Sequence, residues 1–311
     1  MCNNVFEYEL ANIKLRLINI NDKEKLFCDE LLSLIHPHSM IKDQYTYEFH
    51  SSTKHINTDK TPIVLLNAKY YIHNDMCYVE FKNGGTAIWD FSSKIFKYYD
   101  CNKYKNLRNW FFLNIIDPFS LACIEKSKLV VHGSLWEKNG IGSIVCGESG
   151  SGKSTLSLLA KNELTVYCDD CLVVALEGES IIARPIHSGF GIKKEVLRKY
   201  NIEFDENNIL VENKDKLYLK RLEGNNFWSA NVSVKNIFIL RKNSSPKTQI
   251  VKLKKSVAIK LFLDLQTNLP TSFFKAKYML IKSILDKCDV FTVKYNDICD
   301  IDVLLKQVTK G

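Results

Sequence analysis

The segment Gly147-Glu148-Ser149-Gly150-Ser151-Gly152-Lys153-Ser154-Thr155 has the residue types and spacing of a phosphate-binding loop, G-x-x-x-x-G-K-[ST]. Such a loop presents successive backbone N–H groups to a phosphate and ends at a helix N-terminus, where the helix dipole favours an anion. An apolar run at 141–145 precedes the loop, and apolar residues at helical spacing follow it at 156–160. We therefore expect residues 147–155 to bind a nucleotide, ATP by default, together with Mg²⁺.

Two adjacent carboxylates, Asp169 and Asp170, follow an apolar strand pattern and precede another. Phosphoryl transfer needs neutralised phosphate charge, a bound metal and an oriented acceptor. We expect Lys153 to contact the β- and γ-phosphates and the Ser154 hydroxyl to bind Mg²⁺. One aspartate would bind the metal and the other would accept a proton. Neighbouring residues of a strand point to opposite faces, so both can reach one site only where the chain bends. The alternative is a pair of solvent-exposed loop aspartates.

Several other classes of phosphate-loop protein are excluded by motifs that the sequence lacks. There is no L-S-G-G-Q segment of transporter ATPases, and no glycine has an aspartate three positions before it, as the D-x-x-G motif of GTPases requires. The guanine motif N-K-x-D is also absent, because the segment 213–216 reads Asn-Lys-Asp-Lys. Six scattered arginines do not provide the arginine-rich lid of a nucleoside monophosphate kinase.

Composition indicates a cytoplasmic protein that does not cross a membrane. Among the 311 residues there is no apolar run of the length that a membrane span needs, and the N-terminal residues do not have the pattern of a signal peptide. The ten cysteines are scattered through apolar runs, which is typical of buried, reduced thiols. Cys168 and Cys171 form a C-x-x-C without a second pair at zinc spacing, so we interpret them as strand residues.

The net charge of +8 comes mainly from lysine, which indicates a solvated surface and argues against a nucleic-acid partner. An anionic ligand or an acidic peptide partner is the alternative. Five histidines in the N-terminal half do not have metal-ligand spacing, and we interpret them as surface or structural residues. They are His36, His38, His50, His55 and His73.

The pattern predicts two domains, a β-rich domain at 1–103 and a catalytic domain at 104–311. Strands are expected in the first at 6–10, 13–17, 61–71, 78–81 and 86–89, with a hairpin turn at 82–85. In the second, we expect a helix at 104–127 that restarts with Asp117 as N-cap and Pro118 in its first turn. Strands are expected at 129–135, 142–146, 164–168, 171–176, 181–183, 216–219, 234–240 and 290–293, and helices near 255–266, 273–287 and 300–309.

The loop is expected at the end of an antiparallel hairpin, with a turn at 137–140. Parallel nucleotide-binding folds instead approach their loop from an isolated first strand. The order Val131-His132-Gly133-Ser134, hairpin, phosphate loop and Cys168-Asp169-Asp170-Cys171 resembles the catalytic domain of the HPr kinase/phosphorylase family. The resemblance covers about residues 129–192 and extends over the rest in outline.

The resemblance implies an α/β (α+β) fold, with a mixed-sheet kinase core like that of phosphoenolpyruvate carboxykinase behind a small β-rich N-terminal domain. It also implies a kinase that phosphorylates a serine or threonine hydroxyl of a peptide or protein. Asp169 would be the general base, Asp170 and Ser154 would bind Mg²⁺, and His132 would lie near the transferred phosphate. A homo-oligomer is consistent with the resemblance.

Two departures separate this chain from bacterial HPr kinases. Their Glu-x-Arg-Gly-x-Gly segment is replaced by Ile-His-Ser-Gly-Phe-Gly at 186–191, and the first hundred residues do not resemble their N-terminal domain. The chain is more similar in outline to HPr kinase homologues of ribosomal-peptide biosynthesis, including the lasso-peptide kinases, which phosphorylate a precursor peptide. A true HPr kinase/phosphorylase, a small-molecule kinase and a non-catalytic module that senses nucleotide or binds peptide remain alternatives.

Overall fold

The computed structural model describes residues 4–10, 13–34, 44–56, 60–65, 68–82, 84–100, 107–186, 189–202, 204–212, 214–219, 230–242, 248–265, 273–296 and 304. The chain forms two compact units, Met1–Ala122 with Asn268–Phe274, and Cys123–Thr267 with Lys275–Gly311. The division falls inside helix α3 (Asp117–Glu125), whereas the sequence pattern placed it after residue 103. Aromatic contacts explain why helix α2 (Leu107–Phe111), which precedes α3, belongs to the first unit. The ring centroids of Phe111 and Phe27 lie 5.9 Å apart, and those of Trp110 and Phe49 lie 5.6 Å apart.

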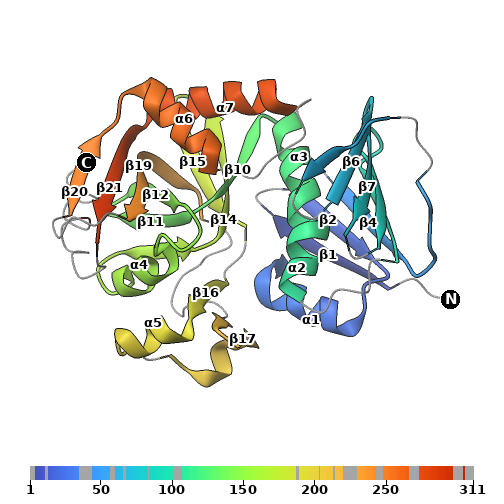
Figure 1. Ribbon diagram of the computed structural model, residues 1–311, viewed down its shortest axis with the longest axis horizontal. Helices are drawn as coiled ribbons and strands as arrows, with labels where there is room; N and C mark the ends of the chain where they lie inside the picture. Colours follow the sequence, from blue (N-terminus) through green and yellow to red (C-terminus); the bar gives the residue numbers. More distant parts are fainter. Residues whose placement is uncertain are drawn as a thin grey trace. The chain divides into compact units, whose positions relative to one another are not determined.

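A nine-stranded mixed sheet forms the first unit, in the order β3-β1-β2-β4-β9-β8-β7-β6-β5 (Figure 1). The strands are β1 (Val5–Leu10), β2 (Ile13–Ile18), β3 (Ser33–Leu34), β4 (Gln44–His50), β5 (Ile63–Leu65), β6 (Ala68–His73), β7 (Met76–Phe81), β8 (Thr86–Asp90) and β9 (Ile95–Tyr99). Burial alternates along β2, β4, β7, β8 and β9, as expected for strands with one face in a core. The predicted β7–β8 hairpin is confirmed, and the candidate strand at 61–71 is two antiparallel strands, β5 and β6.

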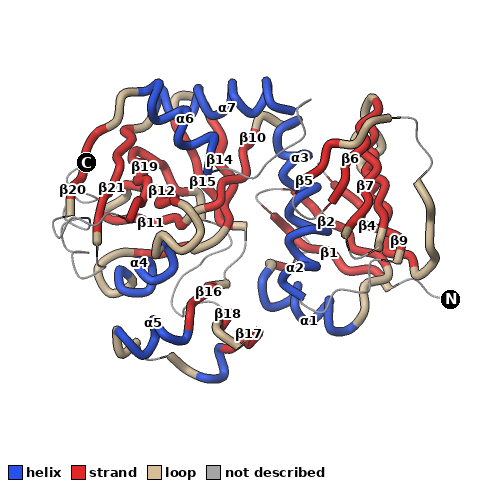
Figure 2. The backbone as a smooth tube through the Cα atoms, viewed as in Figure 1, coloured by secondary structure: helices blue, strands red, loops and turns tan. Residues whose placement is uncertain are grey.

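Helix α1 (Asp22–Leu31) was not predicted, although a local signal for it is present. Asn21 caps the helix by accepting a hydrogen bond from the backbone N–H of Glu24, and the Glu24 carboxylate accepts one from the backbone N–H of Asn21. This reciprocal arrangement is a capping box with Asn in place of Ser or Thr. Figure 2 shows α1 as a helical segment within a unit that is otherwise mainly strand.

The helix after the first sheet is continuous, and the expected restart at Asp117 is wrong. Helix α2 (Leu107–Phe111) passes through a π-helical turn, η2 (Phe112–Ile116), into α3. Pro118 has no N–H to donate to the carbonyl of Asn114, four residues earlier. The Tyr98 hydroxyl donates to that carbonyl at 2.6 Å instead. A tertiary hydrogen bond thus replaces the one that proline removes, so the helix continues where the sequence suggested a new start.

A mixed sheet also forms the second unit, in the order β10-β14-β15-β19-β12-β11-β13, and β20 extends it through β21, which pairs with β19. Its strands are β10 (Lys128–His132), β11 (Ser134–Lys138), β12 (Ile141–Gly147), β13 (Thr165–Cys168), β14 (Cys171–Glu177), β15 (Ser180–Pro185), β19 (Val232–Lys242), β20 (Gln249–Lys252) and β21 (Asp289–Tyr295). Strands β12 and β11 form the predicted antiparallel hairpin, while β19 runs parallel to both β12 and β21.

Helices cover both faces of this sheet. Helix α4 (Lys153–Ala160) packs with Phe238 and Leu240 of β19 in one apolar cluster, and α6 (Lys255–Leu265) and α7 (Phe274–Lys287) pack with Ile237 and Ile239 in the other. Alternate residues of β19 therefore enter opposite cores, as the two-residue period of a strand requires. The predicted helices near 255–266 and 273–287 are confirmed. The helix expected at 300–309 lies outside the described residues except for Leu304.

The predicted strand at 129–135 is two strands, β10 and β11, which separate at Gly133. Strand β10 pairs with β14, and β11 pairs with β12 and β13, so the two strands belong to opposite ends of the sheet order. At Gly133 the chain thus crosses from one end of the sheet to the other. It crosses again between β13 and β14, which only Asp169 and Asp170 separate. The backbone N–H of Gly133 donates to the carbonyl of Asp170 at 3.2 Å and ties the two crossings together. A side chain at Gly133 would meet the carbonyl of Val145 at 2.9 Å, which explains the glycine.

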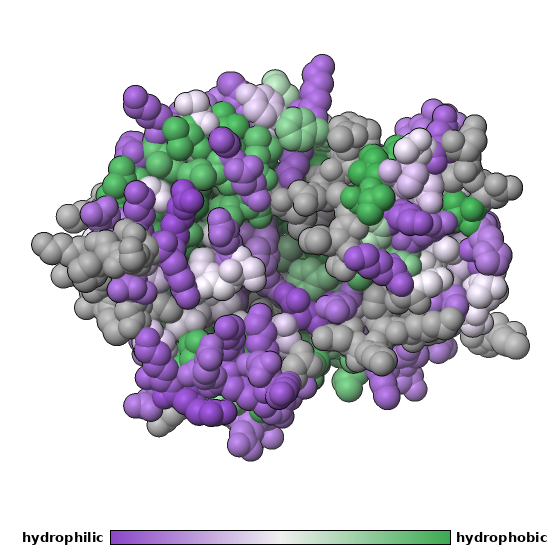
Figure 3. Space-filling view, in the orientation of Figure 1, coloured by the Kyte–Doolittle hydropathy of each residue, from purple (hydrophilic) through white to green (hydrophobic). Residues whose placement is uncertain are grey.

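A small three-stranded sheet completes the second unit. It consists of β16 (Phe190–Lys193), β18 (Lys216–Leu219) and β17 (Ile209–Glu212), with helix α5 (Lys194–Lys199) following β16. Hydrophilic side chains cover much of α5 and this sheet on the face seen in Figure 3. Cysteines in the described segments are free and buried, including Cys168 and Cys171 at strand ends. Among the described residues, no helix has the length and apolar character needed to cross a membrane.

Candidate functional site

The phosphate loop connects the end of β12 to the start of α4, as the sequence predicts. Gly150 and Gly152 have φ of +79° and +88°, in the left-handed region that glycine adopts most easily. A Cβ at Gly147 would lie 2.6 Å from the Ser151 hydroxyl and 2.8 Å from the Leu240 carbonyl. The glycines therefore let the chain turn tightly between β12 and the helix N-terminus, where an anion is favoured.

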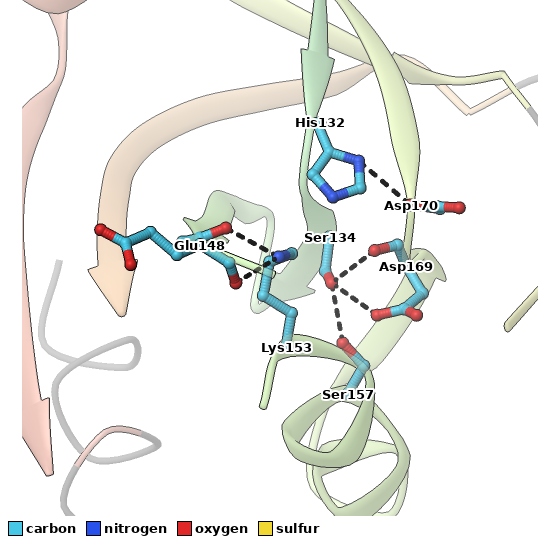
Figure 4. Close-up of polar contacts among 8 residues, drawn as sticks. His132, Ser134, Glu148, Lys153, Ser157, Asp169 and Asp170 are labelled. Carbon is cyan, nitrogen blue, oxygen red and sulfur yellow. Dashed lines mark hydrogen bonds and ion pairs between the residues drawn. The ribbon is translucent and has the colours of Figure 1, made fainter. Parts of the chain in front are cut away.

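Lys153, the first residue of α4, points back into this loop. It is 7 % exposed, and its ammonium donates to the carbonyls of Gly147 at 2.8 Å and Glu148 at 3.3 Å (Figure 4). Burial lowers the pKa of Lys153, and the charges of Asp169 and Asp170 act in the opposite direction. The ammonium thus lies between the loop and the aspartate pair, where it can neutralise anionic charge brought to either.

Asp169 is held by hydroxyl groups that donate to it. The Ser134 hydroxyl contacts both its Oδ1 and its backbone carbonyl, at 3.0 and 3.1 Å, and Ser154 forms a second side-chain hydrogen bond with the carboxylate. The hydrogen bonds continue beyond Ser134: the Ser157 hydroxyl donates to Ser134 at 2.9 Å (Figure 4). Trp136 Nε1 in turn donates to Ser157 at 3.1 Å. This hydrogen-bonded chain fixes the Asp169 carboxylate against α4.

Asp170, the next residue, is paired with a different partner. Its Oδ1 lies 3.0 Å from Nδ1 of His132, at the end of β10 (Figure 4). The side chain of Asp170 is more accessible than that of Asp169, and His132 is more accessible still. Both carboxylates reach the loop because the chain crosses between two ends of the sheet at these residues. The alternative of two solvent-exposed loop aspartates is thereby excluded for Asp169, which is 3 % exposed.

The environment of Asp169 suits either a proton acceptor or a metal ligand. Burial raises its pKa to about 6, the charge of Asp170 adds to this, and Ser154, Ser134 and Lys153 oppose it. Groups near neutrality are the most effective general bases at physiological pH. The Ser154–Asp169 contact also places a hydroxyl and a carboxylate oxygen side by side, the hard donors that Mg²⁺ prefers.

These residues fit a magnesium ion that is bound together with nucleotide phosphates. Among the described residues, no group of three or more His, Cys, Asp or Glu could hold a metal. Mg²⁺ is commonly held by one or two carboxylates plus substrate phosphates, and Ser154 with the aspartate pair provides that incomplete set. The sequence-based assignment of Asp170 and Ser154 to Mg²⁺ stays a prediction, and the hydroxyl of Ser154 contacts Asp169 in this structure.

The loop also fits a phosphate. Ser151 is 5 % exposed, and its hydroxyl has no hydrogen-bond partner in the part of the chain that the structure describes. Buried polar groups normally have partners, so an unpartnered hydroxyl in a phosphate loop is consistent with a ligand that completes it. A pocket adjoins this hydroxyl and is lined by residues 148–151 of the loop and 240–242 of β19.

The structure thus brings together every predicted residue of the loop, together with Asp169, Asp170 and His132. Sequence reasoning missed several polar residues around them. Ser134 and Ser157 are ordinary serines in strand and helix patterns, and Lys216 of β18 lies close enough to affect the charge of Lys153. Arg241 and Lys242 join the pocket through a strand that is remote in sequence. Of the segment 186–191, His187 and Ser188 lie outside the described residues.

Comparisons with known proteins give a distant structural match. No family model matches the sequence, and no curated protein matches it. The chain is similar to the HPr(Ser) kinase/phosphatase from Coxiella burnetii, with a TM-score of 0.32 and 12 % identity over 58 % of this chain and 93 % of that one. At this level of similarity, the residues of the site rather than the match carry the functional assignment.

Proposed function

We propose that this protein is an ATP-dependent kinase that phosphorylates a serine or threonine hydroxyl of a peptide or protein. The observation that carries the proposal is one cluster of residues. Lys153 lies within the phosphate loop, Asp169 is hydrogen-bonded to Ser154, and Asp170 is paired with His132. A loop alone supports only nucleotide binding. The addition of a buried carboxylate with a raised pKa beside the loop supports transfer to a hydroxyl, because the acceptor must lose a proton.

Each residue has a defined part in this proposal. Lys153 and the backbone N–H groups of residues 147–155 bind the phosphates, and Ser154 with Asp170 holds Mg²⁺, which neutralises phosphate charge when bound. Asp169 orients the acceptor hydroxyl and accepts its proton. The acceptor oxygen bonds to the γ-phosphorus, the bond from that phosphorus to the bridging oxygen breaks, and ADP leaves with the electron pair. His132 orients Asp170 and lies beside the transferred phosphate.

The acceptor class is inferred from two features of the sequence. The ordered motifs at 129–192 resemble enzymes that phosphorylate a protein serine, and the β-rich N-terminal residues favour homologues that act on a ribosomal precursor peptide. The net charge of +8 is consistent with an acidic peptide as partner. A nucleic-acid or membrane partner is not part of the proposal.

The test is phosphorylation of candidate acceptors with ATP and Mg²⁺, read as a mass gain of one phosphoryl group. We expect a precursor peptide to be modified, Lys153→Ala and Asp169→Asn to abolish the reaction, and Lys161→Ala to leave it intact. Lys161 is an exposed lysine at the other end of α4, so it controls for loss of charge. Modification of HPr would instead identify an HPr kinase. Tight ATP binding without any acceptor, unaffected by Asp169→Asn, would identify a non-catalytic nucleotide module and refute the proposal.

A further inference from the structure

A pocket beside the phosphate loop contains two basic residues that the site described above does not use. It is lined by residues 148–151 and by Leu240, Arg241 and Lys242 at the end of β19. Arg241 and Lys242 are exposed, and neither forms an ion pair with any described residue. The one acidic residue in the lining, Glu148, extends its carboxylate away from Lys153 and Asp169 (Figure 4). The pocket therefore has an excess of positive charge.

The strand register explains why these residues lie at the loop. Strands β12 and β19 run parallel, and Gly147 pairs with Leu240, so Arg241 and Lys242, the last two residues of β19, lie at the level where Glu148 leaves β12. Ligands of open α/β sheets bind outside the carboxyl ends of parallel strands, which is the edge that these residues occupy. Leu240 itself is buried against α4, so Lys242 continues the α4 face of β19 and Arg241 the opposite face, and both border the pocket at the carboxyl end of the strand.

The same level of the loop holds the ammonium of Lys153, which contacts the carbonyls of Gly147 and Glu148. In a loop of this type the lysine contacts the β- and γ-phosphates. The unpartnered, buried hydroxyl of Ser151 also lines this pocket. Two observations thus point to an anion in this pocket: an orphaned hydroxyl, and two cations without an ion pair among the described residues. The ammonium of Lys153 contacts the carbonyl of Glu148, a residue that also lines the pocket.

The other arginines of the described chain have different environments. Arg16 and Arg108 belong to the first unit, and Arg198 lies exposed on α5. Arg184 is engaged, because it forms a bidentate pair with Glu177, at 2.6 and 2.9 Å, and donates to Asn231. Among the described arginines, Arg241 is therefore the one at the carboxyl edge of the sheet, and a guanidinium can bind a phosphate through two parallel hydrogen bonds.

We propose that Arg241 and Lys242 bind the terminal phosphate of ATP and stabilise its charge during transfer. This inference rests on the proposed function and adds to it two residues that contact the transferred phosphate. As the bond between the γ-phosphorus and the bridging oxygen breaks and the acceptor oxygen bonds to that phosphorus, the charge on the equatorial oxygens stays opposite these cations. An arginine supplied within the same chain performs this role in some phosphate-loop enzymes.

The test compares ATP and ADP binding by calorimetry for the full chain and for Arg241→Gln, Lys242→Gln and the double variant. Salt near 0.15 M shortens the range of non-specific charge effects to about 8 Å. We expect the double variant to bind ATP at least about tenfold more weakly, equivalent to roughly 1.4 kcal/mol, and to bind ADP almost normally. Arg198→Gln, which removes the same charge from an exposed position on α5, is the control and should bind both nucleotides normally.

The outcomes separate this inference from the proposed function. If the unmodified chain does not bind ATP, or Lys153→Ala binds it equally well, the nucleotide site itself is refuted. If binding depends on Lys153 but the double variant binds ATP normally, only the assignment of Arg241 and Lys242 fails. Equal losses for ATP and ADP, or a similar loss in Arg198→Gln, would also overturn it, because neither result is specific to the terminal phosphate.

Discussion

Asp169→Asn should stabilise the protein in the absence of nucleotide and metal, and the gain should grow with pH. Asp169 is 3 % exposed, and burial raises its pKa from 3.8 to about 6. The folded state therefore binds the proton more tightly than the unfolded state. The resulting stability is fully present below pH 3.8 and is lost as the pH rises through 6, where the buried group ionises. Asparagine does not ionise, and its side-chain oxygen can still accept the hydrogen bond that Ser134 donates.

The magnitude follows from the difference between a pKa of 3.8 and one of about 6, because each tenfold change in proton affinity is worth about 1.4 kcal/mol. The free energy of unfolding of the variant should exceed that of the unmodified protein by about 1 kcal/mol near pH 4.5 and by about 3 kcal/mol near pH 8. Urea unfolding in the presence of EDTA measures both differences. Asp264→Asn on α6 is the matched control, because Asp264 is exposed, and it should change stability by less than about 0.5 kcal/mol. If the two proteins were equally stable near pH 8, or if the difference were the same at both pH values, the ionised Asp169 side chain would not be unfavourable in the folded state, and the reasoning would be refuted.

Three further predictions concern the surroundings of this carboxylate. Asp170→Asn should raise the Mg²⁺ concentration that gives half-maximal phosphorylation, whereas Asp169→Asn should abolish turnover even at saturating Mg²⁺. The reverse pattern would exchange the two roles. Ser134→Ala should lower the free energy of unfolding by about 1–3 kcal/mol, because it leaves Ser157 without its acceptor. Ser143→Ala should be nearly neutral, because the buried Ser143 hydroxyl has no partner among the described residues. Chemical denaturation would show no difference between the two variants if the hydrogen-bonded chain were unimportant. Gly147→Ala should abolish ATP binding and destabilise the protein by about 1–3 kcal/mol, because its Cβ would lie 2.8 Å from a backbone carbonyl; normal binding in a calorimeter would contradict the tight loop.

Features that depend on contiguous residues could be predicted from the sequence. The phosphate loop, the β11–β12 hairpin and the positions of Asp169 and Asp170 at a strand end all follow from patterns a few residues long. The continuous helix through Asp117 could not be predicted in this way. Its continuity depends on the hydroxyl of Tyr98, which comes from a different element and satisfies the carbonyl of Asn114 that proline leaves free.

The parts of the site that sequence reasoning missed depend on strand pairing. Nothing near Arg241 in the sequence indicates a phosphate, and its position depends on the parallel register between β12 and β19. Ser134 and Ser157 likewise become significant only when β11 packs on α4. Helix α1 is a different case, because the signal of Asn21 and Glu24 was present in the sequence but is weaker than the Ser or Thr form of the capping box.

The double crossing at Gly133 and at Asp169–Asp170 explains how a strand pattern delivers two neighbouring carboxylates to one phosphate loop. Within a regular strand, one of the two side chains would point to the opposite face. Here β13 ends at Cys168 and β14 starts at Cys171, at opposite ends of the sheet order, so the two aspartates occupy the only residues that are free of a ladder between them. Asp169 turns toward Ser134 and the start of α4, and Asp170 turns toward His132. The crossing that joins the two ends of the sheet thus also places two carboxylates beside the phosphate loop, one buried and one more accessible.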